Sequence, residues 1–281
     1  MTTETLVDSA NTISDVGEGV HHHSFSAISC FSEICSLQYR FRYLDRLPQE
    51  RVSVALVFGT AVNAALVSID KDLAKGRPPR AGVAHQVLRS ELEKAYGNKS
   101  LPVVSTHGED LEGLYGKGVK MIDFYVENLI PDEVPVDMPR RFTIPLLDEK
   151  GEALPRPLVG ELDRVVRLKD GRYGIVDWKT ASARWSPDRI AKDDQATTYL
   201  LAGKYILPGK VSFFRYDLLL KTVKPAIERY YVVRSDNETR RFIKKVLVVD
   251  KAIQSGVFVP NDRSFACPTC PFRNACDVWH C

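Results

Sequence analysis

The stretch GELDRVVRLKDGRYGIVDWKT, residues 160–180, decides the fold of this sequence. β-Branched and aromatic residues surround the turn residues Asp170 and Gly171, and this pattern predicts two strands joined as a hairpin. Because side chains two apart on a strand share a face, Asp177 and Lys179 project together from the second strand. The hairpin therefore fixes an acid and an amine as neighbours.

The length of the turn decides whether a second acid joins them. A two-residue turn places Asp163 of the first strand opposite Trp178, on the other face. A three-residue turn over 169–171, with its glycine in the left-handed conformation, places Asp163 opposite Asp177. We predict the three-residue turn and a pair of adjacent carboxylates.

Two adjacent carboxylates repel each other unless a cation lies between them. A hard divalent ion with oxygen ligands, Mg²⁺ or Mn²⁺, meets that need, and Lys179 beside it could orient a water or stabilise charge on phosphate oxygens. A second interpretation stays open, in which the acids lie on a solvated hairpin and Lys179 only pairs with Asp177. The next helix favours a site, because Gln195 and Tyr199 are four residues apart and share one helical face.

Around this hairpin the sequence predicts a single α/β domain. The predicted helices cover about 52–73, 83–97, 109–130, 188–206 and 236–255, and the predicted strands cover 140–147, 157–168, 172–179, 211–220 and 226–233. A shorter helix is expected to begin at Ser24 to Ser26, where hydroxyl residues precede an apolar periodic stretch. Cys35 is expected on or just after that helix.

The composition is that of a globular protein, because 44% of the 281 residues are hydrophobic and 27% are charged. Residues 1–22 contain four acids and no Lys or Arg, so we expect a disordered leader there and one domain over 23–281. That remainder carries 39 basic and 32 acidic residues, or +7, which permits a nucleic-acid partner without requiring one. Neither a secretory signal nor an apolar run of about 20 residues is evident, so a cytoplasmic protein without membrane contact is expected.

The segment YRFRYLDRLP, residues 39–48, interleaves aromatic and basic residues. Arg40 and Arg42 could contact nucleic acid alongside the rings. The same pattern suits an amphipathic segment whose arginines lie along apolar surface. Both interpretations stay open.

Three of the six cysteines, Cys267, Cys270 and Cys276, lie within ten residues of one another. In an intracellular chain such a group binds metal more often than it forms disulfides. A tetrahedral or cluster site needs a fourth thiolate. Cys30 is expected to be a packed core thiol, and Cys281 is left over.

These features occur in an order that resembles RecB-like members of the PD-(D/E)XK nuclease superfamily, the group with the AddB nuclease domains and the CRISPR-associated adaptation exonucleases. The match is carried by SFSAISCFSEICSLQYRFRYLDRLP at 24–48, FGTAVNAAL at 58–66, GELDRV at 160–165, IVDWKT at 175–180, QATTY at 195–199 and CPTCPFRNAC at 267–276. The resemblance implies a restriction-endonuclease-like core, in which helices flank a mixed central β-sheet. It also implies an N-terminal helical elaboration and a C-terminal cysteine-cluster tail.

The resemblance implies metal ligation by Asp163, by Asp177 and by the backbone carbonyl of Trp178. It makes Lys179 the catalytic lysine of the site. The metal would be Mg²⁺ or Mn²⁺, and the substrate would be DNA.

It further implies that Gln195 and Tyr199 shape this site and contact DNA. The sequence departs from the family pattern at two positions. Leu162 stands where the superfamily has proline, a change that is common among divergent members. Asn63 stands where the family usually has a metal-binding histidine, which leaves a carbonyl oxygen as the ligand and predicts weaker metal binding or lost activity.

For the cysteines, the resemblance implies a 4Fe–4S cluster held by Cys35 together with Cys267, Cys270 and Cys276. Such a cluster would clamp the tail to the N-terminal helix. Zn²⁺ is the alternative, because it accepts four thiolates equally well.

The leading hypothesis is therefore a Mg²⁺- or Mn²⁺-dependent deoxyribonuclease. It would be an exonuclease on single-stranded or frayed DNA ends, in recombination and repair or in CRISPR-type DNA processing. No helicase motif is present, so any unwinding would come from a partner, either a helicase or an adaptation-complex protein. The alternative is a DNA-binding or assembly module of the same fold that has lost its chemistry, and a third hypothesis is a zinc-stapled interaction protein.

Overall fold

The computed structural model describes residues 22–105, 108–137 and 140–279. The expected disordered leader lies outside this part except for its last residue, and Cys281 lies outside it as well. Both expectations therefore stay predictions.

Five strands form the central sheet, and buried apolar residues are concentrated in its middle strands. The strands are β4 Val134–Asp137, β7 Arg164–Arg167, β8 Tyr173–Ala181, β9 Val211–Leu220 and β10 Ala226–Val232. Their order across the sheet is β10-β9-β8-β7-β4. β8 and β9 run parallel and the other neighbours are antiparallel, so the sheet is mixed, as expected.

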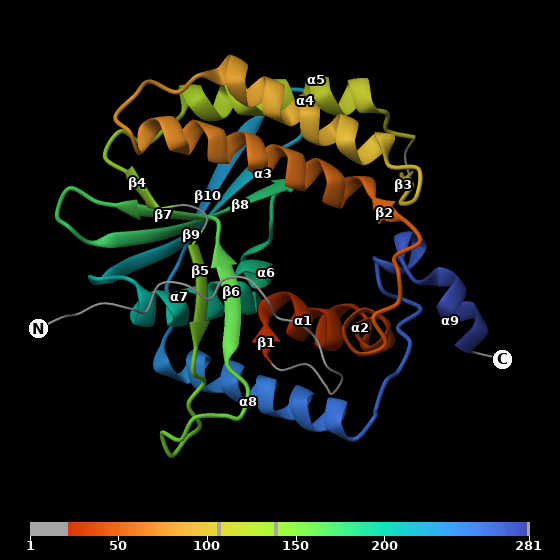
Figure 1. Ribbon diagram of the computed structural model, residues 1–281. Helices are drawn as coiled ribbons and strands as arrows, with labels where there is room; N and C mark the ends of the chain where they lie inside the picture. Colours follow the sequence, from red (N-terminus) through yellow and green to blue (C-terminus); the bar gives the residue numbers. More distant parts are fainter. Residues whose placement is uncertain (1–21, 106–107, 138–139, 280–281) are drawn as a thin grey trace, which may run out of the picture.

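Helices cover both faces of this sheet (Figure 1). On one face lie α3 Val54–Leu73, α4 Ala81–Gly97 and α5 Leu111–Glu127, and on the other lie α6 Pro187–Lys192, α7 Asp194–Ile206 and α8 Asp236–Gln254. Trp178 and Leu219 pack against the first group, whereas Ile175 and Phe214 pack against the second. Because neighbouring residues of β8 and β9 face opposite layers, both strands are apolar along most of their length. The expected α/β architecture is confirmed.

A second sheet contains β1 His23–Ser24, β6 Leu158–Leu162 and β5 Arg140–Ile144, in the order β1-β6-β5. A short parallel pair joins β2 Val52–Ser53 to β3 Val103–Val104. The sequence predicted one strand over 157–168, but the structure divides it at Asp163 into β6 and β7, which belong to different sheets. Asp163 is therefore the corner at which the chain passes from one sheet to the other.

The single helix predicted over 188–206 is likewise two helices. Asp193 between them has extended backbone (φ −72°, ψ 114°), and its side chain accepts a hydrogen bond from the backbone N–H of Gln195 at 2.8 Å. An aspartate inside a helical pattern competes for backbone donors and favours a new helix start. The break fixes where Gln195 stands in the first turn of α7.

Serine side chains cap four helices of the described part of the chain, α1, α3, α6 and α8. Ser24 accepts a hydrogen bond from the backbone N–H of Ala27 at 3.2 Å, which confirms the helix start expected there. Ser235 and Glu238 form a reciprocal capping box at the start of α8.

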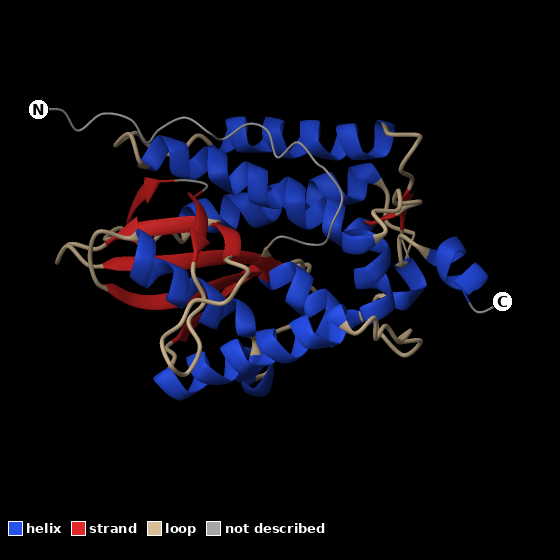
Figure 2. Ribbon diagram, turned by 60° about the horizontal axis from the view of Figure 1, so that its bottom comes forward, coloured by secondary structure: helices blue, strands red, loops and turns tan. Residues whose placement is uncertain are grey.

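The N-terminal helical elaboration and the C-terminal tail lie side by side (Figures 1 and 2). The first consists of α1 Phe25–Ser29, the π-helical turn η1 Cys30–Ile34, α2 Ser36–Tyr39 and the π-helical turn η2 Arg40–Leu44; the second contains η3 Cys267–Thr269 and α9 Arg273–Trp279. The hydroxyl of Ser36 bonds both the N–H and the carbonyl of Val259, at 2.7 and 3.0 Å. The N–H of Glu50 donates to the carbonyl of Pro271 at 2.9 Å. Backbone contacts thus join the two ends of the domain.

Helix α3 is long and apolar enough, by length and composition, to cross a membrane, which the sequence interpretation had not anticipated. Half of its apolar window is buried inside the protein, against α4, α5 and Trp178 of β8. A core helix meets the same criterion, so this single helix is weak evidence for a membrane span.

Candidate active site

The β7–β8 hairpin has the register expected from a three-residue turn. Arg164 pairs with Val176, and the same register continued by one residue sets Asp163 across from Asp177. Gly171 in the turn has a φ of 82°, the left-handed conformation that glycine adopts without strain. The predicted position of the two carboxylates, opposite each other across the hairpin, is confirmed by this register.

Neighbours on two elements hold the Asp177 carboxylate, which is 1% exposed. The side-chain amide of Gln195 donates to Oδ1 of Asp177 at 2.8 Å, and Nζ of Lys179 lies 2.6 Å from Oδ2. Beyond this ion pair, Oδ2 accepts no hydrogen bond of normal geometry from the described residues. This buried oxygen can therefore accept a further cation.

The Asp163 carboxylate is held from α3 and from β8. Nδ2 of Asn63 donates to its Oδ2 at 3.1 Å, and the backbone N–H of Trp178 donates to the same oxygen at 3.4 Å. Asn63 stands 100 residues earlier in the chain, so the fold brings it to the site. The expected metal-binding role of Asn63 stays a prediction.

Burial raises the pKa of both carboxyls. It raises the pKa of Asp177 to about 7, a shift that Lys179 opposes and that the nearby Asp163 increases. Burial also raises the pKa of Asp163, against opposing interactions with Lys179 and with the N–H of Trp178. Burial lowers the pKa of Lys179, but the two carboxylates outweigh burial and the net shift is upward. Two acids against one lysine leave the site in need of further positive charge.

The site lies at the edge of a cleft of about 550 Å³ beside α3, here called the α3 cleft. Asn63, Asp163, Asp177, Lys179 and Gln195 all contribute to its lining. The side chain of Lys179 is 31% exposed, whereas that of Asp177 is 1% exposed. A ligand that enters the cleft therefore meets the lysine more readily than the acid.

Two other predicted site residues are buried beside the cleft. The indole N–H of Trp178 donates to the hydroxyl of Tyr125 at 3.1 Å, which fixes the ring and with it the local backbone. Tyr199 packs edge-on against Phe142 and Phe214, with ring centres 6.1 and 5.9 Å away. The carbonyl ligand role of Trp178 and the DNA contact of Tyr199 stay predictions.

Arg40 and Arg42 lie with the C-terminal tail and do not line the α3 cleft. Arg40 pairs with Asp45 at 3.0 Å, and its guanidinium carbon lies 5.8 Å from the ring centre of Phe258. The guanidinium carbon of Arg42 lies 5.9 Å from the ring centre of Phe272. This packing matches the amphipathic interpretation of the segment, and a contact of these arginines with DNA stays a prediction.

Asp193 is a third acid near the site that the sequence interpretation missed. Besides capping α7, its charge acts on both Asp177 and Lys179. The available signal was an aspartate two residues before Gln195, a spacing typical of a helix cap.

A buried ion network behind the site was also missed. Arg164 donates to Asp70 of α3 at 2.6 Å and to Glu133 at 3.3 Å, and Arg215 of β9 bonds both Glu133 and Asp217. These charges stand on four separate segments, and charged residues are normally on the surface, so no local pattern marks them as buried. Because an unpaired buried charge is costly, the network ties α3 to the face of the sheet behind Asp163.

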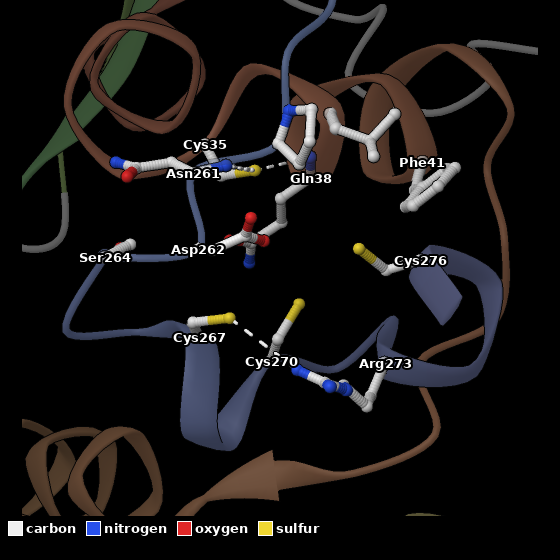
Figure 3. Close-up of a pocket in the computed structure, with 12 residues that line it drawn as sticks. Cys35, Gln38, Phe41, Asn261, Asp262, Ser264, Cys267, Cys270, Arg273 and Cys276 are labelled. Atoms are coloured by element: carbon white, nitrogen blue, oxygen red, sulfur yellow. Dashed lines mark hydrogen bonds between the residues drawn. The ribbon is translucent and has the colours of Figure 1, made fainter. Parts of the chain in front are cut away.

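The four cysteines predicted to act together, Cys35, Cys267, Cys270 and Cys276, line one pocket between the N-terminal helices and the tail (Figure 3). Sγ of Cys35 accepts hydrogen bonds from the backbone N–H groups of Gln38 and Asn261, both at 3.4 Å. Cys30 is buried outside this pocket, and burial raises the pKa of its thiol to about 12, as expected of a core thiol. No disulfide joins the cysteines in the described part of the chain.

The four cysteine side chains of this pocket have the right chemistry to bind a metal group, because each provides a soft sulfur ligand. Within residues 22–105, 108–137 and 140–279, however, no three or more His, Cys, Asp or Glu side chains form a group that could hold a metal ion. Neither this geometry nor the comparisons below identify an iron–sulfur cluster. The expected cluster and the alternative Zn²⁺ stay predictions.

Two adjacent buried carboxylates, a lysine on the same strand and a mixed sheet between helical layers define a nuclease of the restriction-endonuclease-like class. The chain belongs to the PD-(D/E)XK nuclease superfamily, whose sequence profile matches residues 22–277. Members of this superfamily typically use Mg²⁺ or Mn²⁺, and membership implies hydrolysis of DNA. The RecB-like subgroup stays a prediction.

One solved structure supports the same fold. A candidate exonuclease from Eubacterium rectale matches with a TM-score of 0.56 and 15% sequence identity, over 89% of this chain and 88% of that chain. The protein SSO0001 matches with a TM-score of 0.34 and 12% identity, over 82% of this chain and 87% of that one, a similarity too low to carry an argument. No curated protein matches the sequence.

Proposed function

We propose that the protein is a Mg²⁺- or Mn²⁺-dependent deoxyribonuclease, an exonuclease that acts on single-stranded or frayed DNA ends. The observation that carries this proposal is the pairing of Asp163 with Asp177 beside Lys179 at the edge of the α3 cleft. Buried acids that face one another are costly unless a cation compensates them. Membership of a nuclease superfamily and the fold shared with a candidate exonuclease support the same conclusion.

In this proposal Asp163, Asp177 and the backbone carbonyl of Trp178 hold the divalent ion. Asn63 contributes its amide oxygen, which requires the amide to turn, since Nδ2 faces Asp163 in the structure. When bound, the ion supplies positive charge to the phosphate and lowers the pKa of a water.

The remaining roles belong to side chains of the chain itself. The ammonium of Lys179, exposed at the cleft, holds the charge that develops on the phosphate oxygens during hydrolysis. Gln195 fixes Oδ1 of Asp177, so that Oδ2 keeps its orientation. Tyr199 packs near Gln195 and shapes the site from the core side, and it contacts DNA.

Arg40 and Arg42 are proposed to contact DNA that extends toward the tail. The proposed setting is cytoplasmic DNA processing, in recombination and repair or in CRISPR adaptation. The proposed protein partner is a helicase or an adaptation-complex protein, which would supply the unwinding that frayed ends require.

The test is degradation of end-labelled single- and double-stranded DNA by the purified full chain in Mg²⁺ or Mn²⁺, with and without a chelator. Asp177→Ala and Lys179→Ala should each abolish degradation without unfolding the protein. Lys169→Ala is the matched control, because this exposed lysine lies on the same hairpin and, among the described residues, forms its ion pair with Asp132 away from the two acids. Undiminished digestion by either site variant would overturn the assignment.

A second candidate is a DNA-binding or assembly module of the same fold with weakened chemistry. The observation that favours it is that Asn63 donates an N–H to Asp163, and so competes with a cation for that carboxylate. If the wild-type chain binds DNA and cuts none in Mg²⁺ or Mn²⁺, this candidate replaces the first.

We propose that Cys35, Cys267, Cys270 and Cys276 hold a 4Fe–4S cluster with a structural role. Their common pocket and four soft sulfur donors support a thiolate-bound group. Anaerobic purification with a visible absorption spectrum and iron and zinc analysis tests it. A colourless preparation with one zinc per chain would replace the cluster by Zn²⁺.

A further inference from the structure

A second hollow begins where the active site ends. It has a volume of about 900 Å³ and lies between α1, η1, α6, α7 and α8; it is here called the α8 cleft. Lys179 and Gln195 line both this hollow and the α3 cleft, whereas Asp163 and Asp177 line the α3 cleft and not this hollow. A linear molecule with one phosphate at the two acids can therefore continue past Lys179 into the α8 cleft. The volume is near the upper end of the ~300–1,000 Å³ that small-molecule pockets have, so the cleft has room for more than a single small group.

The α8 cleft carries an excess of positive charge. Six cationic and four acidic side chains line it. The acids serve internal contacts: Glu33 and Asp194 each lie 2.7 Å from Nζ of Lys245, Glu238 closes the capping box of α8, and Asp193 caps α7. Most of the negative charge of these four acids is therefore compensated by contacts within the protein.

Two arginines of the cleft have no acidic partner within the described ranges of the chain. Arg189 lies over the ring of Trp185, with its guanidinium carbon 4.0 Å from the ring centre, and makes no ion pair there. Arg241 of α8 also lines the cleft and forms no ion pair with any described residue. Their two guanidinium groups are available to bind phosphate oxygens.

An aromatic ring at the same cleft is left open to solvent. Phe265, on the tail two residues before Cys267, is 87% exposed although it contributes to the lining. A ring so exposed does not stabilise the core, and exposed rings beside cations are what non-specific single-strand binders use to stack bases. Lys245 of α8 meanwhile ties the helix to η1 and α7, so the walls of the cleft are held in place.

We propose that the α8 cleft binds single-stranded DNA on one side of the bond to be cut. Arg189 and Arg241 contact its phosphates, and Phe265 stacks on one of its bases. The inference rests on the proposed nuclease function for the position of the cut, and it names the substrate of that site as a single strand that runs from the α3 cleft past Lys179. A protein ligand or a duplex is the competing occupant.

The experiment measures binding without cleavage. Full-length protein that carries Asp177→Asn is titrated against fluorescent single-stranded oligonucleotides and a matched duplex, by anisotropy at several salt concentrations. Phe265→Ala should weaken single-strand binding roughly 5- to 150-fold, the loss expected for one stacked base. Arg189→Gln and Arg241→Gln should each lower the slope of log affinity against log salt by about 0.7.

Matched controls come from residues next to the cleft. Arg240→Gln neighbours Arg241 on α8 but pairs with Asn237, and Tyr205→Ala removes an exposed ring of α7 that lies outside the cleft. Neither should change the affinity. Unchanged binding by the three cleft variants would overturn the inference, as would equal losses for single strands and duplex.

The result of this binding experiment can be distinguished from the result of the cleavage experiment that tests the proposed function. If the wild-type chain degrades DNA and the cleft variants bind like their parent, the cleft assignment fails and the nuclease stands. If the cleft variants lose single-strand affinity and the wild-type chain cuts nothing, the nuclease fails and the single-strand site stands.

Discussion

The side-chain amide of Gln195 donates a hydrogen bond to Oδ1 of Asp177 at 2.8 Å, which joins the first turn of α7 to the middle of β8. The bond holds one oxygen of a buried carboxylate and leaves the other facing Lys179. Gln195 can take this position because Asp193 interrupts the helical segment and restarts it two residues earlier.

Gln195→Ala should lower DNA cleavage about 10- to 100-fold, the usual cost of removing a residue that orients a metal ligand. The loss should include a higher Mg²⁺ or Mn²⁺ concentration for half-maximal activity, since Asp177 would no longer be pre-oriented. Gln254→Ala, on α8 and away from the site, is the control. Equal metal dependence in both variants would show that Gln195 does not position the carboxylate.

Asn63→His should lower the metal concentration needed for half-maximal cleavage. An imidazole nitrogen binds a transition-metal ion such as Mn²⁺ more strongly than it binds the harder Mg²⁺, so the gain should be larger in Mn²⁺; the N–H that Asn63 now donates to Asp163 would also be removed. Metal titrations of the wild-type chain, Asn63→His and Asn63→Ala measure the effect. Asn63→Ala only removes the amide, so equal gains in both variants would mean that histidine adds no ligand.

Asp70→Asn should change how stability depends on pH. Burial raises the pKa of Asp70 to about 6 from 3.8, a shift that Arg164 opposes. The folded protein thus holds a proton at Asp70 more tightly than the unfolded chain does, so the stability linked to this group is present below pH 3.8 and lost as the pH rises through 6.

Urea unfolding of both proteins at pH 4 and pH 7 tests this. The variant lacks the carboxyl, so its free energy of unfolding relative to wild type should rise by about 2 kcal/mol between the two pH values. The pKa of about 6 already includes the attraction of Arg164 for the ionised carboxylate, so the comparison between the two pH values removes only the costs of the substitution that do not depend on ionisation. Parallel pH profiles would show that Asp70 does not titrate in this range.

Cys270→Ser should reduce the iron content and visible absorption of an anaerobic preparation, and it should speed tryptic cleavage at the exposed Arg263 of the tail. Cys30→Ala is the matched control, because Cys30 is a buried thiol outside the cysteine pocket. The control should keep its iron and its resistance to trypsin. Equal iron in the two variants would remove Cys270 from the proposed ligand set.

The hairpin was predictable because its information is local. A strand period of two and a glycine at the end of a three-residue turn suffice to place Asp163 opposite Asp177, and the register agrees. Most helix and strand segments were predictable for the same reason. The divisions at Asp163 and Asp193 were not, because each depends on partners elsewhere: β6 joins a different sheet from β7, and α7 starts where Asp193 finds the N–H of Gln195.

The ion network and the α8 cleft lay beyond sequence reasoning for a different reason. Arg164 and Arg215 look like surface residues until Asp70 and Glu133, far away in the chain, are placed against them. Phe265 likewise looks like a core residue, and only its 87% exposure marks it as a surface ring. Sequence patterns identify which residues are polar, but the tertiary fold decides which charges are paired and which are left to a ligand.

The contacts between the N-terminal helices and the tail also have a consequence for synthesis. Phe41 packs on Phe272, with ring centres 6.1 Å apart, and the N–H of Asn261 meets the sulfur of Cys35 from 226 residues away. At about 5–20 residues per second, a ribosome takes roughly 2–7 s to travel from Val232, the last residue of β10, to Cys267. During those seconds all strands of the sheet and both acids have been synthesised. The apolar face of the N-terminal helices is still uncovered, because the tail that packs on it has not yet been made. The nascent chain therefore closes its N-terminal helices last, only after the cysteine tail has been made.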